Sequence, residues 1–172
     1  MEDALTFVKL NEVDSKLKYP LIEQVAFCNQ EELTMSGLPM TINVEKRIEN
    51  LIELIDEEDY MIIAQNKSKL ITGILYYYDS IEDSTRYLHT LYINPLRRGK
   101  GLGYRLLSIF METESGLLES SATILATNII SNLGLQKYLD ENDYEYSRVM
   151  ALTGGIREII YRWDHKLKSN RN

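Results

Sequence analysis

Three cationic residues and three glycines fall within the seven residues from Arg97 to Gly103. Glycine lets an anion approach the main chain without a Cβ in the way. A run of leucines at helical spacing follows, and the first N–H groups of a helix have no partner within the helix and carry partial positive charge. This pattern predicts a phosphate-binding loop made by Arg97, Arg98, Gly99, Lys100, Gly101 and Gly103. The alternative is a solvated turn that begins a helix.

Two common phosphate-binding motifs do not fit this loop. The P-loop needs serine or threonine directly after its lysine, but Gly101 follows Lys100. The dinucleotide-binding fingerprint needs glycine at position 104, and that residue is Tyr104. The loop therefore belongs to another class of phosphate site.

A strand and a helix must hold this loop. Residues 86–94 alternate and are rich in β-formers, which predicts a strand, and apolar residues on both of its faces favour a central one. Pro95 has no N–H to donate, so the strand should end there. The predicted alternation places four side chains on one face of the strand: Tyr87, His89, Leu91 and Ile93.

The rest of the chain also divides into helix and strand patterns, which we name by residue range. Helices are predicted from near Pro20 to about Asn29, from the N-cap Asn43 to Ile55, over about 100–113, and over 132–140. The other strands are predicted at 4–10, 60–65, 70–78, 122–127, 144–152 and 156–163, with a loop at 31–42 and a hairpin turn at Gly154-Gly155.

The order of these elements and the loop together resemble the GNAT superfamily of N-acetyltransferases. The loop reads R-x-x-G-x-G at Arg98, Gly101 and Gly103, after a strand that ends in I-N-P, and this resembles motif A of the family. The resemblance implies that the loop and the helix start, Leu102 included, hold the pyrophosphate of acetyl-CoA. It also implies that the main chain at Leu91, Tyr92 and Ile93 binds the pantetheine arm and polarises the thioester.

A second element, N-x-x-A-x-x-[LF]-Y, matches in part from Asn132. In the family this asparagine bonds to the pantetheine, and the tyrosine commonly protonates the departing thiolate. Leu139 stands at the tyrosine position, while Tyr138 precedes it and is rotated by about 100° on a helix. Two readings of Tyr138 stay open: it supplies the acid, or it is a packed aromatic residue.

His89 is the candidate general base, because an imidazole titrates near neutral pH. The alternatives are a hydrogen-bonded core histidine, with a carboxylate or an ordered water as the base. On the neighbouring strand, alternation sends Tyr76 and Tyr78 to one face and Tyr77 to the other.

The composition sets limits on the class of protein. A formal net charge of −7 disfavours general nucleic-acid binding and suits a cationic amine. The single cysteine, Cys28, excludes an internal disulfide and gives no metal-ligand spacing, so no metal is expected. No apolar run reaches membrane-spanning length, and the N-terminus does not read as a signal peptide, so a cytoplasmic protein is expected.

The resemblance implies an α/β fold of the α+β kind. We expect a mixed, mostly antiparallel sheet of about seven strands flanked by about four helices, with a splayed parallel strand pair at the acyl-CoA site. One acyltransferase domain should span residues 1–166, and residues 167–172 should form a polar tail.

The expected activity is transfer of acetyl, or another acyl group, from its CoA thioester to a primary amine of a small molecule or peptide in a ternary complex. The main alternative is a catalytically weak domain that binds CoA or another anion, or a protein partner. An acyltransferase acting on a protein or on an aminoacyl-tRNA is a third, and the negative charge disfavours the tRNA version. The sequence leaves a homodimer open.

Overall fold

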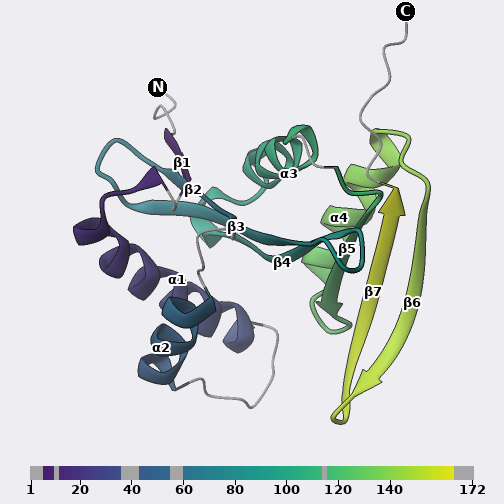
Figure 1. Cartoon of the computed structure of the whole chain (residues 1–172), viewed down its shortest axis with the longest axis horizontal. Helices are drawn as coiled ribbons and strands as arrows, with labels where there is room; N and C mark the ends of the chain where they lie inside the picture. Colours follow the sequence, from purple (N-terminus) through teal and green to yellow (C-terminus); the bar gives the residue numbers. More distant parts are fainter. Residues whose placement is uncertain (1–5, 10–11, 36–42, 55–59, 114–115, 165–172) are drawn as a thin grey trace, which may run out of the picture.

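A computed structural model describes residues 6–9, 12–35, 43–54, 60–113 and 116–164 (Figure 1). In these residues the element order is β-α-α-β-β-β-α-β-α-β-β, as predicted. The helices are α1 (Ser15–Met35), α2 (Val44–Leu54), α3 (Leu102–Glu112) and α4 (Ile129–Glu141), with a short 3-10 helix η2 (Pro95–Arg97). The strands are β1 (Thr6–Lys9), β2 (Tyr60–Gln65), β3 (Ile71–Ser80), β4 (Thr85–Ile93), β5 (Glu119–Leu125), β6 (Tyr146–Thr153) and β7 (Ile156–Asp164). The predicted tail lies outside the described residues.

The strands form one seven-stranded sheet in the order β1-β2-β3-β4-β5-β7-β6. Every neighbouring pair is antiparallel except β4 and β5, which run parallel. Pairing of these two strands begins at Thr85 with Glu119 and ends at Leu88 with Ala122, although β4 continues to Ile93. The predicted mixed sheet and its splayed parallel pair are therefore confirmed.

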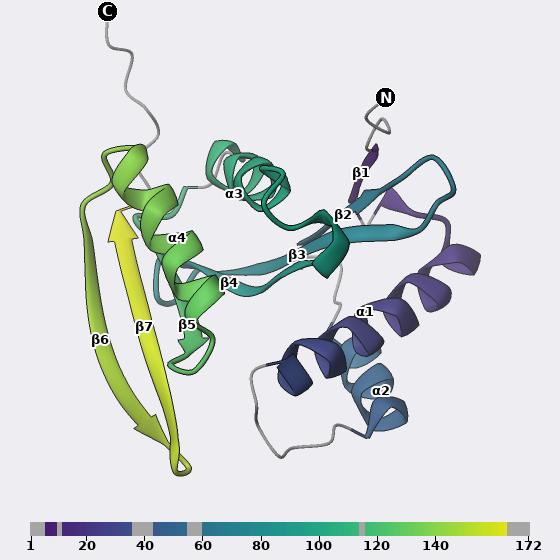
Figure 2. The same cartoon turned by 180° about the vertical axis from the view of Figure 1, so that it is seen from behind.

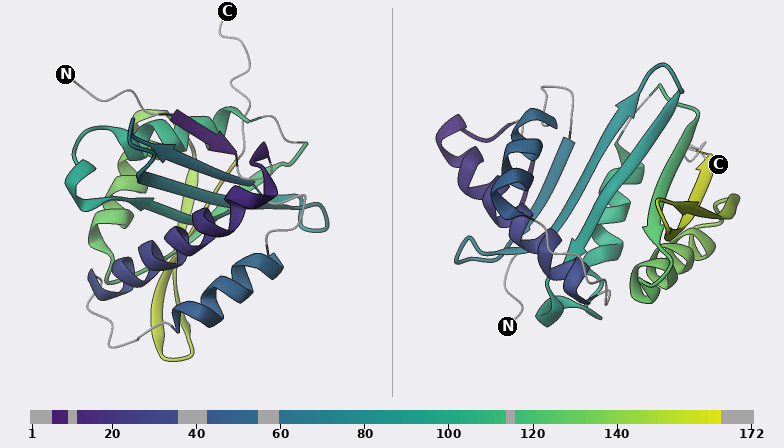
Figure 3. Two further views of the ribbon diagram at one scale, coloured as in Figure 1. Left: turned by 90° about the vertical axis from the view of Figure 1, so that its left-hand side faces the viewer. Right: turned by 90° about the horizontal axis from the view of Figure 1, so that it is seen from below.

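Helices cover both faces of the sheet (Figures 1 and 3). On one face, Leu21, Ile22 and Ala26 of α1 and Ile48 of α2 pack against β2, β3 and β4. On the other face, α3 and α4 cover a larger core whose members include Phe110, Leu139, Tyr161 and Trp163. Tyr76 belongs to the first core and Tyr77 to the second, as strand alternation predicted.

Helix α1 is longer than the sequence pattern indicated. It begins at Ser15 rather than near Pro20, and it continues to Met35 through part of the predicted loop. Asp14 Oδ1 accepts a hydrogen bond from the Lys16 N–H at 2.9 Å and so caps the helix start. A proline in the second turn removes one main-chain donor, and burial of Leu21 and its neighbours on the sheet offsets that loss.

Two predicted local features are confirmed. Asn43 caps α2, because its Oδ1 accepts from the Lys46 N–H at 3.1 Å. The β6–β7 hairpin turns at Gly154 and Gly155, whose φ angles are 58° and 82°. Positive φ at both central positions is what a two-residue hairpin turn requires, and glycine adopts it without strain.

A β-bulge in β4 overturns the predicted alternation of that strand. Tyr76 pairs with Thr90, but the next residue, Tyr77, pairs with Leu88, so His89 is an extra residue. Leu88, Leu91 and Ile93 consequently belong to the core on the α3 and α4 face. The His89 ring instead lies 5.0 Å from the ring of Tyr76, which is in the opposite core. His89 therefore does not share a face with Leu91 and Ile93.

None of the helices in the described part of the chain is long and apolar enough to cross a membrane. Within the same ranges, the His, Cys, Asp and Glu side chains form no group of three or more that could hold a metal ion.

Candidate functional site

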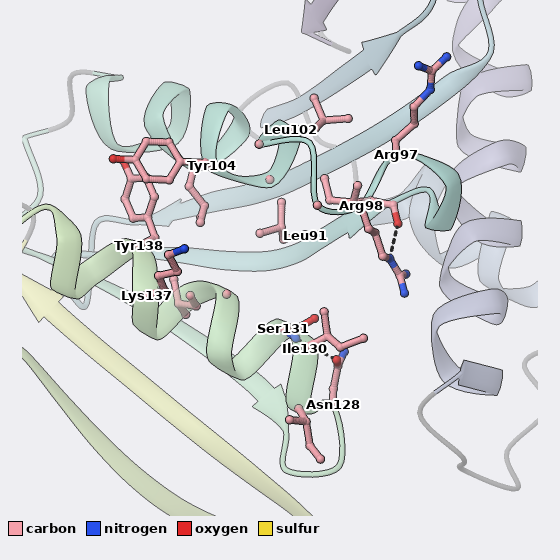
Figure 4. A pocket seen from close by; sticks show the side chains of 18 of the residues that line it. Leu91, Arg97, Arg98, Leu102, Tyr104, Asn128, Ile130, Ser131, Lys137 and Tyr138 are labelled. Atoms are coloured by element: carbon pink, nitrogen blue, oxygen red, sulfur yellow. Dashed lines mark hydrogen bonds between the residues drawn. The ribbon is translucent and has the colours of Figure 1, made fainter.

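A cavity of about 640 Å³ lies between α3 and α4 (Figure 4). A volume of this size is typical of small-molecule sites. Four segments line it: the end of β4, the loop from Arg97 to Gly101, the first turns of α3, and one side of α4 with the residues before it. The lining residues that the sequence predicted are Leu91, Ile93, Arg97, Arg98, Gly99, Gly101, Leu102, Gly103 and Tyr138.

Backbone conformation explains two glycines of the loop. Gly99 and Gly101 have φ angles of 70° and 76°, in the left-handed region that other residues rarely adopt. Gly101 is also the N-cap of α3 and makes no side-chain cap, so the first N–H groups of α3 are left for an anion. Gly103 has ordinary helical geometry, and a Cβ there would meet Ile93 Cγ1 at 3.6 Å.

The three cations of the loop are placed differently. Arg98 Nε donates to the Ile93 carbonyl at 2.9 Å, and Figure 4 shows its guanidinium directed toward α4. Arg97 also lines the cavity, but its side chain extends in the opposite direction in the same view. Lys100 Nζ donates to the Leu96 carbonyl at 3.3 Å, and Lys100 is not among the lining residues. Arg98 is therefore the cation best placed to meet an anion in the cavity.

The end of β4 supplies one wall. Leu91 and Ile93 direct their side chains to this face, whereas Tyr92 is buried in the core on the other face. Leu91 lies three residues beyond the last pairing of β4 with β5. The main chain of β4 next to the cavity thus faces the space that opens between the two strands.

Helix α4 supplies the opposite wall, and Tyr138 lies on it. Its hydroxyl is 3.3 Å from Ser108 Oγ of α3, and its ring packs edge-on against Tyr104 with centroids 4.7 Å apart. Burial raises the pKa of Tyr138 above its ordinary value, while the hydrogen bond to Ser108 lowers it in part. Leu139, at the family's tyrosine position, is fully buried in the core.

Asn132 lies behind this wall and outside the lining. Its Nδ2 donates to the carbonyls of Leu125 and Asn128, both at 2.9 Å, which ties α4 to the end of β5. His89 also lies outside the lining, because the bulge turns it to the α1 and α2 face, and its Nδ1 is 2.9 Å from Thr90 Oγ1.

Sequence reasoning missed part of the cavity wall. The missed residues are Tyr104, Leu107, Leu135, Gly134, Lys137, Glu141 and the segment 127–131. Ile130, Gly134, Lys137 and Glu141 recur at i, i+4, i+7 and i+11, which is the spacing of one helix face. That spacing could have identified the face, but its residues are mixed in polarity and so make no amphipathic signal.

Comparison by sequence finds no relative: no protein-family model matches the chain, and no curated protein matches it. Comparison by structure does. The chain superposes on a protein from Desulfovibrio desulfuricans, named as an acetyltransferase of the GNAT family, with a TM-score of 0.66 and 17% identity over 95% of this chain and 100% of that one. The chain has the GNAT fold.

Two further solved structures of acetyltransferases resemble it equally well. One is yncA from Salmonella typhimurium, named as an acetyltransferase and solved with its cofactor acetyl-CoA; the TM-score is 0.67, at 14% identity over 99% of each chain. The other is the diaminobutyrate acetyltransferase EctA from Paenibacillus lautus, in complex with its substrate L-2,4-diaminobutyric acid and coenzyme A. Its TM-score is 0.67, at 12% identity over 95% of this chain and 96% of that one. Agreement over nearly the whole length shows that the GNAT fold spans β1 to β7.

Proposed function

We propose that this chain is a CoA-dependent N-acyltransferase. It transfers an acyl group, most simply acetyl, from the CoA thioester to a primary amine of a small molecule or peptide while both substrates are bound. One observation carries the proposal. The cavity joins a helix N-terminus with a glycine-rich, cationic loop to the place where β4 and β5 separate. The yncA and EctA structures, which have the same fold, contain acetyl-CoA and coenzyme A.

The loop fits the pyrophosphate of acetyl-CoA. A phosphate can approach the main chain at Gly99 and Gly101, because a Cβ is absent there and the first N–H groups of α3 point outward. Arg98 adds a charged donor beside these groups. Residues 91–93 would then bond to the pantetheine as an added strand, since β4 does not pair with β5 beyond Leu88.

The proposed reaction follows from this placement. The neutral amine nitrogen attacks the thioester carbon, a C–N bond forms, the C–S bond breaks, and the CoA thiolate leaves. The main-chain N–H at Ile93 stabilises the negative charge that develops on the carbonyl oxygen. His89, at the bulge on the α1 and α2 face, is the proposed acceptor of the amine proton, directly or through water. Tyr138, protonated and lining the cavity, is the proposed donor to the thiolate.

The acceptor is proposed to be a cationic amine rather than a nucleic acid. The net charge of −7 favours approach of a cation and disfavours a polyanion. The EctA structure contains a diamine substrate, L-2,4-diaminobutyric acid. Release of free CoA thiol from acetyl-CoA is the direct test, measured with a panel of amines and with mass spectrometry of the product.

A CoA-binding domain without turnover is the second candidate, favoured by Leu139 at the position where the family has tyrosine. The two candidates give different results in the same experiment. Acetyl-CoA should raise the melting temperature in both cases, because a ligand of the folded state stabilises it. Thiol release above the no-amine control supports the enzyme. Binding without thiol release, over the whole panel and a metabolite extract, supports the binding domain.

A further inference from the structure

Ser108 of α3 forms a hydrogen bond with the proposed proton donor. Its Oγ lies 3.3 Å from the hydroxyl oxygen of Tyr138 on α4. Both helices cover the same face of the sheet, as Figure 2 shows. Tyr138 is buried and lines the cavity, whereas Ser108 is half-buried and is not among the lining residues. Ser108 is thus placed to act on a bound substrate through Tyr138 rather than by direct contact.

The Tyr138 ring is held on two sides. The ring of Tyr104 packs edge-on against it with centroids 4.7 Å apart, and the ring of Tyr144 is stacked beside it at 6.5 Å. Asn142 Nδ2 donates to the Tyr138 carbonyl at 2.8 Å, which fixes the main chain in the last turn of α4. These contacts restrict movement of the phenol, so its hydroxyl stays within reach of Ser108.

The neighbouring hydroxyl of Tyr104 is bonded to an amide instead. It donates to Asn142 Oδ1 at 3.2 Å and accepts from Asn142 Nδ2 at 2.9 Å, so its single proton is directed to the amide oxygen. The hydroxyl of Tyr138 bonds to a serine, which can donate or accept. Of the two tyrosines in this wall, Tyr138 is therefore the one whose proton can change direction.

The direction of the Tyr138 proton depends on Ser108. Each hydroxyl carries one proton, and only one of the two protons can lie between the oxygens. When the serine proton lies there, the phenol proton is free to point into the cavity. Serine and threonine in helices often donate to the carbonyl four residues earlier, as Thr113 Oγ1 does to the Ile109 carbonyl at 2.7 Å. Within the described residues the Ser108 hydroxyl bonds to Tyr138 instead, so its proton is available to the phenol oxygen.

Negative charge on the phenol oxygen strengthens the bond from Ser108. Burial raises the pKa of Tyr138, and the hydrogen bond from Ser108 lowers it in part. The titratable groups that face the phenol, which are Tyr144, Tyr104 and Glu112, raise its pKa. A phenolate can only accept, so the serine must donate once Tyr138 has lost its proton. The 3.3 Å separation of the neutral pair is long for two hydroxyls, so the bond can shorten when the charge forms.

We propose that Ser108 is a positioning residue for acid catalysis, which donates to the Tyr138 oxygen and leaves the phenol proton directed at the CoA thiolate. This role rests on the proposed function, in which Tyr138 is the proton donor. The phenol O–H bond breaks, an S–H bond forms on CoA, and negative charge passes from sulfur to the phenol oxygen, where the Ser108 O–H stabilises it. The phenolate then takes a proton from solvent, which receives the proton that the amine released.

Turnover in a double-variant cycle tests whether Ser108 acts through Tyr138. On an acceptor amine established by thiol release, Ser108→Ala should lower kcat by about threefold to tenfold, with the KM for acetyl-CoA unchanged. Ser108→Thr keeps a hydroxyl at this position and should keep the parent kcat. In a Tyr138→Phe background Ser108→Ala should have no further effect, because the oxygen on which it acts is absent. A full second loss in the double variant, or parent kcat in Ser108→Ala, overturns the proposal.

Ionisation of the phenol tests the same bond without turnover. 3,5-Difluorotyrosine is placed at position 138, because fluorine makes the phenol acidic enough to ionise while the protein stays folded, and its absorbance is followed against pH. Ser108→Ala should raise the pH of ionisation, since the phenolate loses a donor, and Ser108→Thr should leave it unchanged. An unchanged midpoint in Ser108→Ala overturns the role of Ser108 even where thiol is released. A raised midpoint without thiol release from any amine overturns the proposed function, and with it the catalytic role.

The control is Ser147→Ala, which removes the hydroxyl of an exposed serine on β6, outside the cavity lining. It should keep the parent kcat and the parent midpoint of ionisation. Circular dichroism and melting temperature establish that every variant is folded, and an unchanged KM for acetyl-CoA separates a loss of chemistry from a loss of binding. A fall in kcat for Ser147→Ala as large as that for Ser108→Ala would contradict a role specific to Ser108.

Discussion

The hydroxyl groups of Tyr138 and Ser108 lie 3.3 Å apart, so a hydrogen bond joins α4 to α3 at the wall of the cavity. Tyr138 is 4% exposed, and burial raises its pKa above the ordinary value. A tyrosine with a raised pKa stays protonated at neutral pH, and the protonated form is the one that can donate. Tyr138, the residue before Leu139 in the sequence, therefore lines the cavity and is protonated at neutral pH.

Replacing Tyr138 tests this role. If Tyr138 protonates the thiolate, Tyr138→Phe should lower kcat by about tenfold or more on an established acceptor, with acetyl-CoA affinity unchanged. Tyr104→Phe is the matched control, because it removes a hydroxyl that lines the same cavity and bonds to Asn142. It should keep parent turnover. Parent-like turnover in Tyr138→Phe would show that Tyr138 only packs.

The buried tyrosines predict how stability changes at alkaline pH. Burial raises the pKa of Tyr138, Tyr144 and Tyr161 in the folded state. The unfolded chain therefore loses these protons at lower pH than the folded protein does, so the folded state binds more protons in that window. Stability is fully present below the ordinary tyrosine pKa of about 10 and falls as pH rises beyond it. Urea unfolding at a series of alkaline pH values measures this, and a flat profile across that window contradicts it.

Gly103 separates ligand binding from folding. Its Cβ position meets Ile93 at an ordinary contact distance, so Gly103→Leu should leave the unliganded melting temperature unchanged or higher. The added side chain should block the approach of the pyrophosphate and abolish the melting-temperature rise with acetyl-CoA. Gly116→Leu, where a Cβ meets open space, is the control and should keep the full rise. If acetyl-CoA raises the melting temperature of Gly103→Leu as much as that of the parent, the pyrophosphate does not bind at Gly103.

Arg98 and Lys100 should contribute unequally to CoA binding. Arg98 lines the cavity and Lys100 does not, so Arg98→Ala should weaken binding by about 1–2 kcal/mol and Lys100→Ala by less than about 0.5 kcal/mol. Calorimetric titration at low and high salt measures both. The Arg98 loss should shrink as salt rises, because the charge is partly exposed. Equal losses in the two variants would contradict the placement of Arg98.

Arg86 predicts a stability effect away from the cavity. It is 1% exposed, bonds to both carboxylate oxygens of Asp79 at 2.7 and 2.8 Å, and donates to the Thr113 carbonyl at the end of α3 at 2.8 Å. Arg86→Ala should lower the free energy of unfolding by about 3 kcal/mol, since a buried guanidinium is lost and both the half-buried Asp79 carboxylate and the Thr113 carbonyl lose their donor. Lys137→Ala breaks an exposed ion pair with Glu141 and should cost under about 1 kcal/mol in the same denaturation experiment. A comparable loss of unfolding free energy in both variants would contradict the expectation that the buried Arg86 contributes more to stability than the exposed Lys137.

Short-range pattern predicted the elements and the loop well, because strand alternation, caps and glycine turns are local. Tyr76 and Tyr77 went to opposite faces, and Asn43 capped α2 as expected. The conformation of the glycine loop could be predicted for the same reason. Its requirements, positive φ at Gly99 and Gly101 and a helix immediately after, are met within a few residues.

Features that depend on tertiary packing could not be predicted from the sequence. The pattern placed a helix start near Pro20, but burial of α1 on the sheet carries the helix through the proline. The bulge at His89 has no local signature, since it depends on how β4 pairs with β3. The face of α4 around Tyr138 lines a cavity, and its residues are both polar and apolar, so the sequence shows no amphipathic pattern there. These features depend on long-range contacts.

The short pairing of β4 with β5 has a mechanical consequence. Four residue pairs, from Thr85–Glu119 to Leu88–Ala122, form the seam between a half-sheet of β1 to β4 and a half-sheet of β5 to β7. Beyond Leu88 and Ala122 no main-chain hydrogen bonds of the described strands join the two half-sheets, and the cavity lies between the end of β4 and α4. A ligand that spans from β4 to α4 would act as a strut between the two half-sheets. Its arrival would then stiffen the whole molecule, rather than only the loop that holds it.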